Sequence, residues 1–171
     1  METADLAQMS PQDGVAALRS LPRRFRAALR PVDDPDVEEW AERVASSGHA
    51  PLDHLVDAER SIGLLAGALG QVLHHDTPVL VPATTDPAVR EWPPHRGSLD
   101  DELARLGETA EALASLAERV PAGDWGRTAT VAGGGGSVSA LDVLREAVRT
   151  AVTDLRAAER DFDEVRRAAQ G

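Results

Sequence analysis

The sequence predicts an all-α fold, and specifically an antiparallel four-helix bundle with long ordered connections. Four segments carry apolar residues at alternating intervals of three and four, which places these residues on one face of a helix. Four such helices can bury their apolar faces together. Strand-like patterns are confined to 79–81 and 128–131, which are short enough to be loops. The 171 residues, of which 42% are hydrophobic, suit one domain over 1–171, with a core of about 12–168 after an N-terminal extension of 1–11.

The first helix is predicted from about Gln12 to Arg30. Pro22 interrupts it, and because proline lacks an N–H group and its ring clashes with the preceding turn, we expect a kink or a restart there. A short extra helix is predicted from Pro35 to Val44, within the first connection. The apolar positions of the first helix are Leu18, Leu21, Phe25 and Ala28.

The second helix is predicted to begin at Pro51, since proline is tolerated in a first turn where its missing donor would be unpaired anyway. It ends before Thr77-Pro78, because the residue before a proline disfavours helical angles. Its apolar seam is Leu55, Ala58, Ile62, Leu65, Leu69 and Val72.

The third helix is predicted to run from a Ser98 cap to Pro121. Asp100, Asp101 and Glu102 follow the cap and favour the positive end of the helix dipole. Its seam is Leu99, Leu103, Leu106, Ala110, Leu113, Ala117 and Val120.

The last helix has the most regular seam, and Ser137 or Ser139 can cap its start. The intervals alternate between three and four without a break, while Arg and Glu fill the opposite face. The seam consists of Leu141, Leu144, Val148, Ala151, Leu155, Ala158, Phe162 and Val165.

Two connections contain most of the irregular residues. Residues 78–97 hold five of the eleven prolines together with Trp92 and His95, which predicts an ordered crossing segment. Residues 123–136 hold Trp125 and four consecutive glycines, which predict a mobile loop.

Composition excludes several classes of function. The net charge of −11 disfavours binding to nucleic acid or to anionic membranes. The chain has no cysteine, tyrosine or lysine, which excludes thiolate and Schiff-base chemistry and cysteine-bound metals. No apolar run approaches the length of a membrane span, and the first residues are acidic where a signal peptide is basic. We therefore expect a cytoplasmic protein.

The stretch from Leu52 to Arg60, read with Leu21-Pro22, Trp40, the Trp125 loop and the helix that follows, resembles the DinB-like superfamily. That group includes bacterial thiol S-transferases and the N-terminal domain of mycothiol-dependent maleylpyruvate isomerase. The resemblance covers about residues 12–168. It implies a four-helix bundle, commonly dimeric.

The resemblance also implies a divalent metal held by one histidine of the second helix and two histidines, four residues apart, of the last. His54 matches the first. One alignment puts the other two at Ala151 and Leu155, and another at Thr153 and Ala157, but no histidine follows His95. The first alignment is favoured because Ala151 and Leu155 lie on the inward seam. A metal left with one nitrogen ligand would lose most of its binding free energy.

The predicted ligand-pocket residues are therefore His54, Asp57, Ala151, Thr153 and Leu155, with no metal and His54 as a weak candidate ligand. Asp57 and Glu59 could act as acid or base, although such charges usually belong to a solvated face.

Three other features contain residue types that occur in binding sites. His74-His75-Asp76, with His95, could bind a metal, but histidines also stabilise the end of a helix. The run Gly133–Gly136 lacks the Lys-Ser/Thr of a phosphate loop. The three tryptophans are expected to cover the bundle ends, and one or two could line a pocket. They are Trp40, Trp92 and Trp125.

The sequence favours a metal-free binding or accessory protein with an unknown small-molecule ligand, no cofactor and a homodimeric state. One alternative is a mycothiol-type S-transferase or isomerase that uses a low-molecular-weight thiol and a divalent metal, such as Zn or Ni, at His54. The other is a structural or oligomerisation module, because Leu64, Val56 and Leu73 widen the apolar arc of the second helix.

Overall fold

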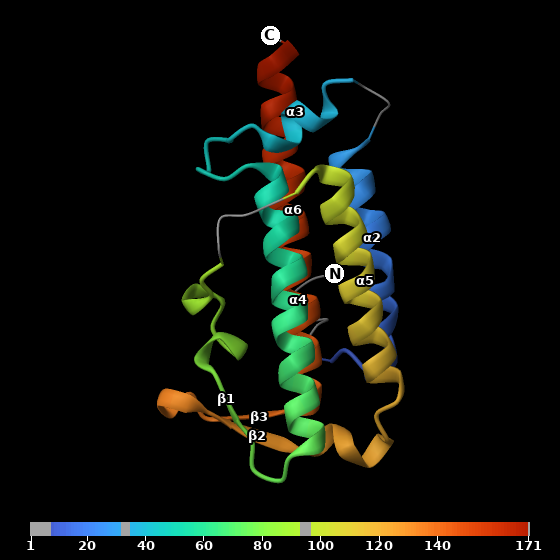
Figure 1. Cartoon of the computed structure of the whole chain (residues 1–171), viewed down its shortest axis with the longest axis vertical. Helices are drawn as coiled ribbons and strands as arrows, with labels where there is room; N and C mark the ends of the chain where they lie inside the picture. Colours follow the sequence, from blue (N-terminus) through green and yellow to red (C-terminus); the bar gives the residue numbers. More distant parts are fainter. Residues whose placement is uncertain (1–7, 32–34, 93–96, 171) are drawn as a thin grey trace.

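The computed structural model describes residues 8–31, 35–92 and 97–170. Across these ranges the chain is predominantly helical, which confirms the predicted helical class (Figure 1). No helix in the described ranges is long and apolar enough to cross a membrane.

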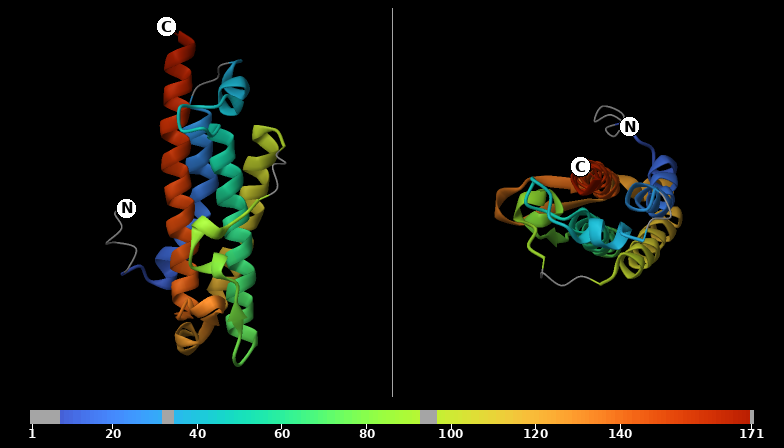
Figure 2. Two further views of the ribbon diagram at one scale, coloured as in Figure 1. Left: turned by 90° about the vertical axis from the view of Figure 1, so that its left-hand side faces the viewer. Right: turned by 90° about the horizontal axis from the view of Figure 1, so that it is seen from above.

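Four long helices of the described chain lie side by side (Figures 1 and 2). Helix α6 packs on α4 and α2, and α5 packs on the same two helices, so apolar faces from all four meet in one core. The predicted seams point into this core: Leu55, Leu106 and Leu155 are fully buried. The four helices are α2 (Pro11–Leu29), α4 (Pro51–His74), α5 (Leu99–Glu118) and α6 (Ala140–Gln170).

The predicted caps are present. The Ser98 hydroxyl accepts from the Asp101 backbone N–H at 3.2 Å at the start of α5. At α6 the cap is Ser139, whose hydroxyl accepts from the Asp142 N–H at 3.1 Å. Ser137 lies in a strand instead. Each cap pairs a donor that the first turn leaves without a partner.

Of the kink or restart predicted at Pro22, the restart is wrong, because α2 is one helix with Pro22 in its interior. The Pro22 ring reaches α5, where its Cγ is 4.0 Å from the place a Cβ would take on Gly107. Packing against α5 therefore offsets the hydrogen bond that proline cannot make. The short helix α3 (Val37–Glu42) lies within the predicted range, and the Trp40 ring meets Phe162 of α6 edge-on at 6.2 Å.

The strand-like stretches at 79–81 and 128–131, which are short enough to be loops, contribute two strands of a small sheet. The sheet order is β1 (Val79–Leu80), β2 (Thr128–Val131) and β3 (Ser137–Ser139). β1 is parallel to β2, and β2 is antiparallel to β3. The sheet lies beside the lower end of α4 (Figure 1).

The glycine run, for which the sequence predicts a mobile loop, forms the reversal between β2 and β3. Gly133, Gly134 and Gly136 adopt φ values of 74°, 85° and 82°, which other residues rarely adopt. The reversal allows Val131 N–H to donate to Gly136 O at 2.9 Å. Residues 78–92 of the predicted crossing segment contain the short helices η1 (Pro82–Thr84) and η2 (Pro87–Val89). His95 lies outside the described residues.

Candidate functional site between helices α4 and α6

The crossing segment runs along α4 and α6 (Figure 2), and its Arg90 donates to polar side chains of both helices. Within each helix they recur at intervals of three, four or seven residues, which keeps them on one face. They form three groups, which follow one another from the α3 end toward the sheet. On α4 they are His54, Asp57 and Ser61, and on α6 Glu146, Thr150, Asp154 and Asp161.

The first group joins His54 to Asp161. His54 Nε2 lies 2.9 Å from Asp161 Oδ2, and their side chains are only 13% and 7% exposed. The Ser47 hydroxyl donates to the same oxygen at 2.6 Å. Burial acts to raise the pKa of Asp161, but the hydrogen bonds from Ser47 and His54 outweigh it and hold the pKa below 3.8. Asp161 is therefore an ionised anchor at neutral pH.

This group does not have the order of a serine nucleophile with its base. The carboxylate of Asp161 stands between Ser47 and His54, so the imidazole does not accept the serine proton. The arrangement instead ties the segment before α4 to α6. Ser46 adds to the tie, because its N–H and hydroxyl donate to Glu164 at 2.8 and 2.9 Å.

The second group is a pair of carboxyl groups, Asp57 and Asp154. Burial raises the pKa of Asp154 from 3.8 to about 7, the Asp57 carboxylate adds to the effect, and Arg90 opposes it. Burial also raises the pKa of Asp57, against the influence of His54. Asp154 Oδ2 is buried and accepts no hydrogen bond from any described residue. Near neutral pH, Asp154 is therefore present in both its protonated and its ionised form, and its Oδ2 is a buried acceptor.

The third group surrounds Arg90, which enters from the crossing segment and has only 3% of its side chain exposed. Its Nη1 donates to Ser61 at 3.3 Å and to Thr150 at 3.1 Å, and its Nη2 donates to Glu146 at 3.1 Å. Its Nε donates to the Ala83 carbonyl at 2.7 Å. A fixed cation thus lies between α4 and α6.

Of the predicted pocket residues, only His54 and Asp57 lie on this face. Ala151 and Leu155 are fully buried in the core, and Thr153 is exposed, where its hydroxyl donates to Arg149 O at 2.9 Å. The five residues therefore do not line one pocket.

Sequence reasoning missed Asp154, Asp161 and Arg90. The polar positions 146, 150 and 154 recur every four residues, a signal that could have revealed the face that α6 turns toward α4. Nothing local marks Arg90, because the crossing segment brings it there.

The residues present do not fit the metal that the family resemblance implies. Ala151 and Leu155 offer no donor atoms, and the His54 Nε2 is already paired with Asp161. Within the described ranges, no group of three or more His, Asp or Glu side chains could hold a metal ion.

The histidine cluster at the end of α4 and Glu59 make contacts that stabilise the fold. His74, His75 and Asp76 are exposed at the end of α4, where Arg127 donates to the His75 carbonyl at 3.0 Å. Glu59 is not simply solvated, because it accepts from the Thr109 hydroxyl of α5 at 2.7 Å.

Comparison with known protein families, with curated proteins and with solved structures finds no match for this chain. The polar face is therefore interpreted from its own geometry.

Proposed function

We propose that this chain is a DinB-like four-helix-bundle protein that binds a small molecule on the polar face between α4 and α6 without a resident metal. It would act as a cytoplasmic, homodimeric binding or accessory protein. The observation that carries the proposal is the buried guanidinium of Arg90, hydrogen-bonded to residues of both helices.

Arg90 supports a metal-independent site because it already supplies a positive charge to this face. Its bond to Glu146 compensates a carboxylate that is only 12% exposed. It also acts on Asp154, whose pKa it moves down while burial moves it up.

The ligand that suits this face carries an N–H or O–H donor. Asp154 Oδ2 is a buried acceptor that no described residue satisfies, and a buried unsatisfied acceptor costs about 1–3 kcal/mol. A donor on the ligand would remove that cost. An anionic ligand would instead meet the Asp57 and Asp154 carboxyl groups.

Metal analysis of the purified protein tests the proposal. We expect less than about 0.1 equivalent of Zn, Ni or Mn per chain, and a melting temperature that a chelator changes by less than about 1 °C. One tightly held ion per chain, lost in His54→Ala but kept in the control His74→Ala, would overturn it. His74 is a suitable control because it is exposed at the far end of α4.

The homodimer is part of the proposal and is supported by apolar side chains on and beside the crossing segment. Val79, Val81 and Val89 are 63%, 54% and 50% exposed. A second copy covering them would remove this apolar area from water. Light scattering that gives the mass of one 18.1 kDa chain at micromolar concentration would refute the dimer.

A second candidate, a thiol-dependent S-transferase or isomerase, is favoured by one observation. Asp154 has a pKa of about 7, near the value at which an acid–base group works best at neutral pH. Turnover of a low-molecular-weight thiol conjugate, lost in Asp154→Asn and kept in the exposed control Asp163→Asn, would favour this candidate over a binding protein.

A further inference from the structure

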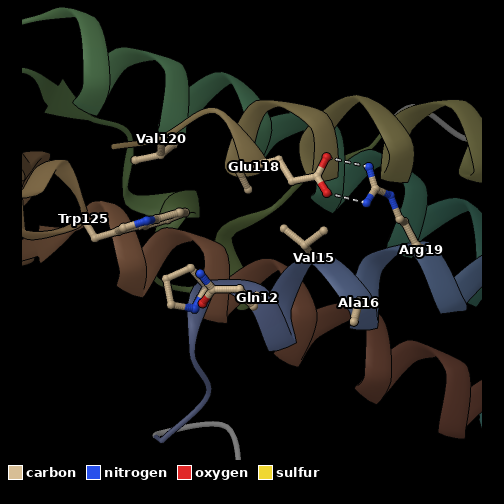
Figure 3. Close-up of a pocket in the computed structure, with 9 residues that line it drawn as sticks. Gln12, Val15, Ala16, Arg19, Glu118, Val120 and Trp125 are labelled. Atoms are coloured by element: carbon tan, nitrogen blue, oxygen red, sulfur yellow. Dashed lines mark hydrogen bonds and ion pairs between the residues drawn. The ribbon is translucent and has the colours of Figure 1, made fainter. Parts of the chain in front are cut away.

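A cavity lies away from the polar face, between the start of α2 and the end of α5 (Figure 3). Its volume is about 360 Å³, which is within the range of cavities that hold small molecules. It is lined by α2, α5 and the short helix η3 (Ala122–Gly126), and it shares no residue with the α4–α6 face.

The cavity has apolar walls and an aromatic side. Val15 and Ala117 are buried beneath it, and Val120 flanks it. Trp125 is partly buried against the core, and its ring stands at one end of the cavity (Figure 3). Such walls suit a flat apolar group.

The other end of the cavity is charged. Arg19 donates to both oxygens of Glu118, at 2.7 and 2.8 Å, as Figure 3 shows. It also donates to both oxygens of Glu111, at 3.0 Å each. The hydrogen bonds from Arg19 lower the pKa of both glutamates, so both are ionised at neutral pH. One cation between two anions leaves a net charge of −1 here.

We propose that this cavity binds a small organic cation with a flat apolar body, such as an arylalkylamine. The ring would pack on Trp125 and Val15, and the ammonium group would donate to the Glu118 carboxylate. Glu118 can accept such a bond because each carboxylate oxygen has a further lone pair beside the one that Arg19 occupies. An anionic ligand would face the excess negative charge of the site and of the chain, whose net charge is −11.

Phenethylamine and its neutral analogue phenethyl alcohol test the proposal, since they share the ring and the chain and differ in charge. Calorimetric titration of the whole protein should give binding of the amine about tenfold tighter than that of the alcohol at low salt. In NMR spectra, the amine should shift the one indole N–H signal that disappears in Trp125→Leu.

Glu118→Gln and Glu111→Gln form a matched pair of variants. Each removes one negative charge from the Arg19 cluster, but only Glu118 lines the cavity. We expect Glu118→Gln to weaken the amine by about tenfold and Glu111→Gln by less than about threefold, with the alcohol unchanged in both. Both side chains are about half exposed, at 52% and 53%, so both variants should keep the far-UV circular dichroism of the wild type.

Equal affinity for amine and alcohol would overturn the proposal, and so would equal losses in the two glutamine variants. A shift at an indole other than that of Trp125 would place the amine elsewhere and also overturn it.

Discussion

Replacing Asp154 with asparagine tests whether the α4–α6 face holds a carboxyl group that resists ionisation. In the unfolded chain Asp154 loses its proton near its ordinary pKa of 3.8, whereas in the folded chain it keeps the proton until about pH 7. Between these values the folded state binds more protons than the unfolded state. The free energy of unfolding therefore falls as pH rises from 3.8 to about 7, and the loss is complete above that range. Asparagine has nearly the same shape and does not titrate.

The size of the stability difference follows from the interval between the unfolded and folded pKa values of Asp154. At about 1.4 kcal/mol for each pH unit, the span from 3.8 to about 7 corresponds to about 4 kcal/mol. Asp154 is not fully enclosed by protein, and water screens part of this cost. We therefore expect Asp154→Asn to be more stable than wild type by about 2 kcal/mol at about pH 8, and by less than about 1 kcal/mol at about pH 5.

Urea unfolding followed by far-UV circular dichroism, repeated between about pH 5 and about pH 8, measures this difference. Asp163→Asn is the matched control, because Asp163 lies on the same helix with 59% of its side chain exposed. Its effect should stay within about 0.5 kcal/mol at every pH. Wild-type and Asp154→Asn stabilities that run parallel across the range would refute the reasoning, as would an asparagine variant that is less stable at about pH 8.

Three further substitutions test other parts of the structure by the same urea assay. Arg90→Ala should destabilise the protein by about 3 kcal/mol, because it removes a buried guanidinium that donates to Ser61, Thr150, Glu146 and the Ala83 carbonyl. Arg43→Ala, whose side chain is 44% exposed, should cost less than about 0.5 kcal/mol, and equal costs would contradict the role of Arg90. Asp161→Asn should cost about 1–2 kcal/mol of stability at neutral pH. Because the pKa of Asp161 is depressed, the difference in stability from wild type should shrink as pH falls below 3.8. A difference that stays constant with pH would show that the Asp161 carboxylate is not ionised in the folded protein. Gly67→Ala should stabilise α4 by about 1 kcal/mol, since a Cβ there meets nothing within 4 Å. Gly14→Ala should give no gain in stability, since its Cβ would lie 2.9 Å from a buried leucine of α6. Equal gains in the two variants would show that the packing at Gly14 is loose.

Most of the helical structure could be predicted from the sequence, because a helix and its apolar face depend on residues three and four apart. Ser98 caps its helix as predicted, and the α6 seam is buried from Leu144 to Val165. The errors arose where distant contacts override local preference. Helix α2 continues through Pro22 because α5 packs against it, and β1 forms only because β2, about fifty residues later, pairs with it.

The candidate site could be predicted only in part. His54 and Asp57 lie on the polar face, as their spacing on one helix indicates. The sequence places the pocket residues of α6 at Ala151 and Leu155, because these positions point inward. The side of α6 that meets the polar face of α4 instead carries Thr150 and Asp154. That side depends on how the two helices are rotated against each other, which the seam alone does not specify.

The sequence by itself determined where the four long helices lie, which residues they bury and which chemistry the missing cysteine, lysine and tyrosine exclude. Only the tertiary structure decided which polar groups meet. His54 pairs with Asp161, 107 residues away, and Arg90 reaches both helices from a segment that has no regular pattern. Local periodicity is encoded in neighbouring residues, whereas the ionisation of a buried group depends on what the whole chain places beside it.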